Sequence, residues 1–366
     1  MALELNEKHY QLLKECSEAK DFTQWNNLME STNEIIRLRD GDFSGWTLNG
    51  ASFHTPNGDY MDLQSANFES STLEGVNFIN AHLFKANFKN AKISYSSFTN
   101  ADLIKSCFFG AEIISSDFNQ ANLQESDFGE SRVTAANMYE SIFWLANLRG
   151  ARFIGRTGVV PDNFRSNLCG ALFNKAHFNS DTYFENYNIS SKTDFRTISF
   201  EAANFSQGLR QTLRYCNRRH NWTDWYDNKP PLLRTFVKFF WSLSNYGLSP
   251  KRVLTSFFLS TLFFTTIYLF FPPLIEGIRP HNIMDSFYFS IVTMTTLGFG
   301  DMHAGKHWIA QLIVMFQVVF GYLLLGSLIT MLSELYYSDG PSQELIPHGD
   351  KPKSFMATQV GFSLKP

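Results

Sequence analysis

The feature that most constrains the fold is a repeat of five residues. From Leu63 to Phe128 a large apolar side chain stands at every fifth position, and aliphatic residues alternate with phenylalanine. From Phe68 onward, the residue two positions before each large one is small, except at Val76. A period of five fits neither the 3.6-residue helix nor the two-residue strand. It predicts a coil with four short sides, each of which points one large side chain inward. The large positions are Leu63, Phe68, Leu73, Phe78, Leu83, Phe88, Ile93, Phe98, Leu103, Phe108, Ile113, Phe118, Leu123 and Phe128.

This pattern, in which Asn or Asp often stands between the small and the large residue, resembles that of the pentapeptide-repeat family. The resemblance implies a right-handed quadrilateral β-helix, which we expect over residues 41–205. Such solenoids need capped ends. The helical pattern of residues 1–40 predicts a helical cap, with an oligomerisation element as the alternative. The repeat loosens at residues 155–164, which predicts a looped-out corner.

The charge balance argues against a nucleic-acid role. Some pentapeptide-repeat proteins resemble DNA and bind gyrase, which requires a strongly acidic surface. Residues 43–205 hold 16 acidic and 12 basic residues, and the whole chain has a net charge of −3. We therefore expect no nucleic-acid partner and interpret the solenoid as a scaffold or a gating domain.

Two apolar runs without charge follow, residues 253–271 and 308–333. The first has 19 residues and, at 1.5 Å per residue, a length of about 28 Å, enough for the hydrocarbon core of a bilayer. Both runs therefore predict membrane spans, and the region between them carries the sequence Thr293-Met294-Thr295-Thr296-Leu297-Gly298-Phe299-Gly300-Asp301.

Gly298 and Gly300 suit a backbone that directs successive carbonyl groups at one axis, because glycine reaches positive φ without a Cβ clash. Rings of carbonyl oxygens can replace the hydration shell of a cation. The motif Thr-x-x-Thr-x-Gly-Phe-Gly-Asp between two spans resembles the pore signature of tetrameric potassium channels. The resemblance implies a selectivity filter at residues 296–300 and four subunits around one pore. It places K⁺ at the carbonyls of Thr296, Leu297, Gly298 and Phe299, with the Thr296 hydroxyl, and Asp301 at the outer mouth.

Two positions differ from the commonest filter pattern. Leu297 stands where Val or Ile is usual, and Phe299 where Tyr is usual. A tyrosine hydroxyl there is normally braced by aromatic residues of the pore helix, so this filter is expected to be less tightly held. A weakly selective cation channel is therefore the alternative. The expected filter supports are Thr293, Thr295, Tyr288, Phe289 and Val292.

A short pore helix is predicted over residues 283–295. Asn282 is its expected N-cap, and Asp285 stands three residues later as a capping-box variant. The negative end of the helix dipole would then favour a cation at the filter. Gly321 and Gly326 in the second span are candidates for a gating hinge or for close helix contacts, and both interpretations stay open.

Residues 206–250 are basic and aromatic, which predicts a linker with an interfacial helix, or alternatively a packed linker. Arg234, Lys238, Lys251 and Arg252 precede the first span, whereas Arg279 and Lys306 lie between the spans. This bias predicts that both termini are cytoplasmic, as does the lack of a signal-peptide core in the first thirty residues. The pore domain would cover residues 251–337, and a flexible tail residues 338–366.

Together these features predict a multi-domain membrane protein of the inner cell membrane. A cytoplasmic β-helix would precede an α-helical two-span pore domain with a re-entrant pore helix and a selectivity filter. We expect no enzyme activity and no cofactor besides permeant K⁺. The expected partners are three further copies of the chain, membrane lipids and an unidentified cytoplasmic regulator of the repeat domain. The alternative from another class is a membrane-anchored interaction protein.

Overall fold

The computed structural model describes residues 5–32, 34–55, 61–155, 166–206, 208–227, 229–247 and 249–336, and Leu345. The chain divides into two compact units. One is Met1–His220 with Ser342–Pro366, and the other is Asn221–Pro341. Nearly all of the predicted looped-out corner (155–164) and of the predicted tail (338–366) lies outside the described residues.

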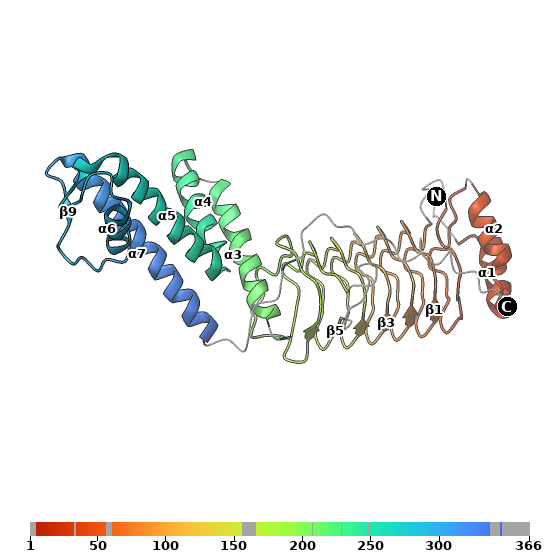
Figure 1. Ribbon diagram of the computed structural model, residues 1–366. Coiled ribbons are helices and arrows are strands. Elements are labelled where there is room, and N and C mark those ends of the chain that lie inside the picture. The colour runs from red at the N-terminus through yellow and green to blue at the C-terminus, as the bar shows by residue number, and fades with distance from the viewer. Residues whose placement is uncertain are drawn as a thin grey trace, which may run out of the picture. The chain divides into compact units, whose positions relative to one another are not determined.

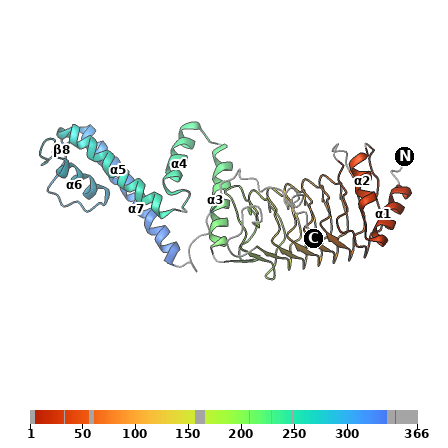
Figure 2. The ribbon, with the colours of Figure 1, turned by 45° about the vertical axis from the view of Figure 1, so that its right-hand side comes forward.

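The first unit is a β-solenoid whose short parallel strands stack along one side (Figures 1 and 2). Leu73 is in register with Ile93, and Ile93 with Ile113, so one coil holds four repeats of five residues. The strands are β1 (Thr72–Glu74), β2 (Lys92–Ser94), β3 (Glu112–Ile114), β4 (Arg132–Thr134), β5 (Arg152–Ile154), β6 (Tyr183–Glu185) and β7 (Asn204–Phe205).

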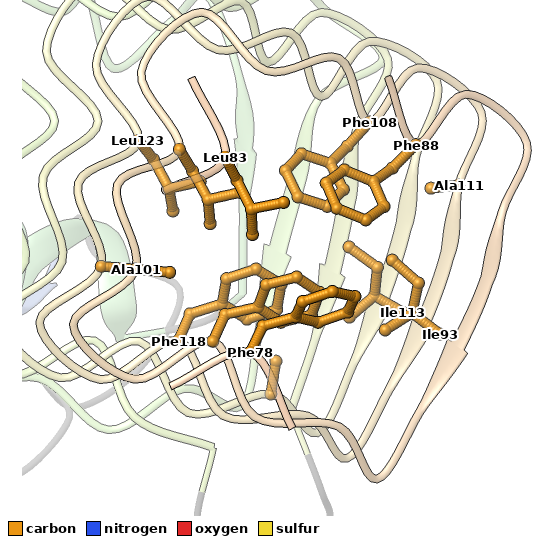
Figure 3. Packing of buried hydrophobic residues seen from close by; sticks show 14 of the residues in the cluster. Phe78, Leu83, Phe88, Ile93, Ala101, Phe108, Ala111, Ile113, Phe118 and Leu123 are labelled. Carbon is orange, nitrogen blue, oxygen red and sulfur yellow. The ribbon is translucent and has the colours of Figure 1, made fainter. Parts of the chain in front are cut away.

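The core of the solenoid is built from the large residue of each repeat. Every such position from Leu63 to Phe128 is fully buried. Figure 3 shows the phenylalanines in two columns, with aliphatic side chains between them. Within a column the rings are stacked, as for Phe88 and Phe108 at 4.8 Å, and rings of different columns meet edge to face, as for Phe98 and Phe108 at 6.2 Å. The burial that the repeat predicts is therefore present in the fold.

The backbone takes a left-handed conformation at the corners of the coil. Positive φ recurs every five residues, at Ser65, Ser70 and Gly75, and also at long side chains such as Lys85. Each non-glycine residue in this region costs about 1–3 kcal/mol and persists only where its surroundings impose it. The Asn or Asp before the large residue supports the turn, since Asp117 Oδ1 accepts a hydrogen bond of 2.9 Å from the amide of Asn119.

Helices cover both ends of the solenoid. Helices α1 (Glu7–Ala19) and α2 (Thr23–Ser31) bury Trp25, which packs on Phe53 and donates its indole N–H to the Ser52 carbonyl. At the other end, α3 (Leu209–Asp227) contributes Leu209 and Leu213 to the core. The predicted cap ends at Ser31 rather than at residue 40, because Ile36 and Leu38 are already buried in the solenoid core.

The second unit is mainly helical. It contains the C-terminal part of α3, followed by α4, α5, the 3₁₀ turn η2, α6 and α7, with a small antiparallel sheet of β8 and β9. The bounds are α4 (Pro231–Ser244), α5 (Pro250–Phe270), η2 (Pro272–Leu274), β8 (Ile275–Glu276), α6 (Ile283–Met294), β9 (His303–Ala304) and α7 (Trp308–Tyr336). The expected β-solenoid followed by two candidate membrane helices is confirmed.

Candidate functional site

Two helices of the second unit are long and apolar enough to cross a bilayer. They are α5, with 21 residues, and the part of α7 from Trp308 to Ser333, with 26. At 1.5 Å per residue, 21 residues extend about 32 Å, which exceeds the thickness of a hydrocarbon core. Both helices carry large apolar side chains on their exposed faces, among them Phe258, Phe263 and Phe316.

The shorter helix α6 begins at a side-chain cap. Asn282 Oδ1 accepts hydrogen bonds from the amides of Met284 and Asp285, as predicted. Asp285 does not complete the predicted capping box. Its carboxylate accepts hydrogen bonds from the Arg279 side chain at 2.7 Å, and the amide of Asn282 donates to the Arg279 carbonyl instead. Arg279 therefore ties the loop before α6 to its first turn.

Residues 296–300 follow directly after α6, and their backbone alternates in φ. Thr296, Gly298 and Gly300 have φ of +57°, +53° and +80°, whereas Leu297 and Phe299 are not in the positive-φ region. Such alternation turns successive carbonyl groups toward the same side of the chain. Within the described part of the chain, no hydrogen bond reaches a carbonyl oxygen of these residues. Their side chains are exposed, Leu297 by 63% and Phe299 by 65%.

Further contacts lie at the C-terminal end of this segment. The rings of Tyr288 and Phe299 are parallel, with centroids 6.3 Å apart, and the Tyr288 hydroxyl interacts with the Asp301 carboxylate. Just beyond, Glu276 of β8 pairs with His303 of β9. The C-terminal end of the segment thus lies between contacts with α6 and the two-stranded sheet of β8 and β9.

The remaining predicted supports lie at the C-terminal end of α6. Val292, Thr293 and Phe289 are buried, and Phe289 meets the Tyr268 ring of α5 edge to face at 5.2 Å. The Thr295 hydroxyl donates to the carbonyls of Ile291 and Val292. It therefore closes the last turn of α6 and does not reach residues 296–300.

A polar cluster that was not predicted from the sequence lies behind α6. Gln317 of α7 is completely buried and is hydrogen-bonded to Tyr268 of α5 and to Ser290 of α6. The sequence did contain a signal, because an amide inside an uncharged span needs a partner away from lipid. What it lacked was the identity of that partner.

The atoms of residues 296–300 that could bind a cation are neutral oxygens. In the described ranges, no group of three or more His, Cys, Asp or Glu residues is placed to hold a metal ion. A cation bound here would meet only carbonyl and hydroxyl oxygens, which suits a weakly held permeant ion better than a resident metal.

Comparison with known families agrees with this geometry. Residues 256–338 match the family model described as an ion channel. Residues 62–100 and 116–154 match the model for pentapeptide repeats, in eight copies. The chain joins pentapeptide repeats to an ion-channel domain. Neither matched family is a family of enzymes. A comparison with curated proteins gave no match.

Several solved structures are similar to part of the chain. HetL of the cyanobacterium Nostoc, a pentapeptide repeat protein involved in heterocyst differentiation regulation, is 19% identical, with a TM-score of 0.30. The match covers 52% of this chain and 80% of HetL. QnrB1, a plasmid-mediated fluoroquinolone resistance protein, is 16% identical over 47% of this chain and 83% of its own length, with a TM-score of 0.25. A pentapeptide repeat protein of the Arabidopsis thaliana thylakoid lumen is 22% identical over 34% of this chain and 70% of its own, with a TM-score of 0.16.

The two glycines of the second span of the channel domain have different surroundings. A Cβ on Gly321 would lie 2.3 Å from the carbonyl oxygen of Met294, so α7 passes directly against the end of α6 there. A Cβ on Gly326 would meet no atom within 4 Å. Gly321 therefore has a packing role in the single chain, whereas Gly326 has none.

Proposed function

We propose that four copies of this chain form a potassium-selective channel through which K⁺ passes passively. The observation that carries the proposal is the backbone of residues 296–300, whose φ alternates and whose carbonyl oxygens accept no hydrogen bond among the described residues. Irregular backbone at membrane depth is tolerated only where it is buried in protein or lines a water-filled path. Carbonyl groups facing a shared axis meet that condition, because ions and water satisfy them.

The same geometry calls for several subunits, and the resemblance to tetrameric potassium channels implies four. One chain supplies a single exposed strand of carbonyls, and a dehydrated cation needs oxygen ligands on several sides. A closed ring of identical chains provides them. The proposed ligands are the carbonyls of Thr296, Leu297, Gly298 and Phe299, with Asp301 attracting cations at the outer mouth.

The channel would lie in the inner cell membrane with both termini in the cytoplasm. Arg234, Lys238, Lys251 and Arg252 precede α5, and this excess of basic residues favours the cytoplasmic side. Helix α4 would lie along the membrane surface, because its exposed apolar side chains form one face. They are Leu232, Leu233, Phe236 and Phe239. Helices of this type lie in the headgroup region.

The solenoid would then serve as a cytoplasmic scaffold or as a gating domain that receives an unidentified regulator. Its core is continuous and its surface is mixed in charge, which suits a rigid module for protein contacts. If the channel domain were only an anchor, the same module would make the chain a membrane-bound interaction protein.

The decisive test is the reversal potential of the purified protein in planar bilayers under opposing K⁺ and Na⁺ gradients. We expect reversal near the K⁺ equilibrium potential. Reversal near zero with robust current would instead establish a weakly selective cation channel, for which Phe299 gives the reason.

Glycine variants link the current to the filter. Gly298→Ala and Gly300→Ala should abolish the flux, because both positions need positive φ. Gly45→Ala is the matched control, since Gly45 has a φ of +69° and equally open surroundings but lies in the solenoid. Unchanged activity in the two filter variants would favour the anchor function.

A further inference from the structure

Gln317 is the centre of a hydrogen-bond network that joins three helices. Its Oε1 accepts a hydrogen bond from the Tyr268 hydroxyl of α5. Its Nε2 donates to both the carbonyl and the hydroxyl oxygen of Ser290 in α6, each at 3.0 Å. The Ser290 hydroxyl in turn donates to the Thr261 carbonyl of α5 at 2.8 Å. Every donor and acceptor has a complementary partner, so the amide has only one orientation that satisfies the network.

Because this network lies inside a membrane domain, breaking its hydrogen bonds is costly. Gln317, Tyr268 and Ser290 are fully buried within the single chain. A buried amide or hydroxyl that loses its partner in an apolar environment is strongly disfavoured. The three helices therefore cannot rotate or slide past one another without breaking several hydrogen bonds at once.

The same stretch of α6 contacts both the network and the filter. Tyr288 lies parallel to Phe299, Phe289 packs on Tyr268, and Ser290 binds Gln317. A rotation of α6 that released Ser290 would also move Tyr288 away from Phe299. The pore helix thus links the buried amide to the outer part of residues 296–300.

A second contact fixes the inner end of α6. Gly321 is one helical turn after Gln317 and so lies on the same face of α7. It allows α7 to approach the Met294 carbonyl directly. Gln317 and Gly321 together hold α6 by its side chains and by its backbone, next to the first residue of the filter.

We infer that Gln317 is the positioning residue of the filter. Its hydrogen bonds to Tyr268 and Ser290 fix the position of α6. This keeps the carbonyls of residues 296–300 at the spacing that discriminates K⁺ from Na⁺. These hydrogen bonds stabilise the filter in place of the tyrosine hydroxyl that Phe299 lacks. The inference rests on the proposed function, since it assigns a source to the selectivity of the channel.

The test compares reversal potentials of the full-length protein in bilayers, first for the wild type and then for Gln317→Leu, Tyr268→Phe and Gln311→Leu. Gln311 is on the same helix but exposed, so Gln311→Leu is the matched control. The reversal potential reports only conducting channels, because misfolded protein carries no current. A loss of folding therefore cannot imitate a loss of selectivity.

We expect Gln317→Leu to lower the K⁺/Na⁺ permeability ratio at least tenfold, a shift of about 59 mV for a monovalent ion. Tyr268→Phe should lower it less, and Gln311→Leu should match the wild type. The double variant Tyr268→Phe/Gln317→Leu should be no worse than Gln317→Leu, because both changes break one network. If Gln317→Leu gives no channels, Tyr268→Phe decides alone, since it removes one oxygen and keeps the ring on Phe289.

Wild-type reversal potentials in Gln317→Leu and Tyr268→Phe would refute the positioning role of Gln317 and leave the proposed function intact. So would an equal loss of selectivity in Gln311→Leu. A wild-type channel that does not select K⁺ would refute the proposed function itself, and with it the positioning role of Gln317. The wild-type measurement therefore separates the two failures.

Discussion

Replacing Phe108 by alanine should destabilise the solenoid far more than replacing its neighbour Phe109. Phe108 is fully buried, and its ring stacks between Phe88 at 4.8 Å and Phe128 at 4.6 Å. Removing a buried phenylalanine leaves a cavity and costs about 3–5 kcal/mol. Phe109 is 39% exposed, so water fills the space that its ring leaves, and the loss is about 1 kcal/mol.

Thermal unfolding of the full-length protein in detergent, followed by circular dichroism and calorimetry, measures this difference. For a unit of this size, 1 kcal/mol moves Tm by about 2–4 °C. Phe108→Ala should therefore lower the Tm of the solenoid by about 6–20 °C, and Phe109→Ala by about 2–4 °C. Similar shifts in the two variants would refute the reasoning, because they would mean that the phenylalanine columns do not carry the stability of the coil.

Other perturbations test particular contacts. Gly321→Ala should reduce the current strongly by forcing α7 away from α6, whereas Gly326→Ala should conduct nearly normally, and equal currents in bilayers would contradict this packing. Tyr288→Phe keeps the ring on Phe299 but loses the contact with Asp301, so the current should decline faster during a sustained recording. Burial raises the pKa of Asp117, so its ionisation weakens the fold as pH rises from the unfolded-state value, about 3.9, through the higher folded-state value. Asp117→Asn should therefore raise Tm at pH 7 but not at pH 3, and a gain that is independent of pH would count against this explanation.

The solenoid was largely predictable from the sequence, for a physical reason. Each repeat buries one large side chain, so the spacing of the apolar residues determines the geometry of the coil. The sequence did not predict the left-handed corners. Asn80 and Gly75 are residues that favour positive φ, but Lys85 is not, and it has the same conformation. Hydrogen bonds to the adjacent coil impose it, as from the amide of Lys85 to the Ile104 carbonyl.

The channel domain was likewise predictable from the sequence only in part. The apolar runs and the glycines of residues 296–300 pointed to two spans and a carbonyl-lined filter, and the ion-channel family match agrees with the spans. The salt bridge of Arg279 with Asp285 replaced the expected capping box, because a guanidinium binds a carboxylate more strongly than a backbone amide does. The first helix of the linker, α3, was also not foreseen.

By itself the sequence determined which residues are buried along the solenoid and where the chain can cross a membrane, because both follow from the spacing and length of apolar segments. Only the tertiary structure decided which residues form the polar network behind α6. Gln317, Tyr268 and Ser290 lie far apart in the chain, and nothing local to any of them specifies the others. Their association depends on how α5, α6 and α7 pack, since a buried amide takes whichever partners the neighbouring helices bring within reach.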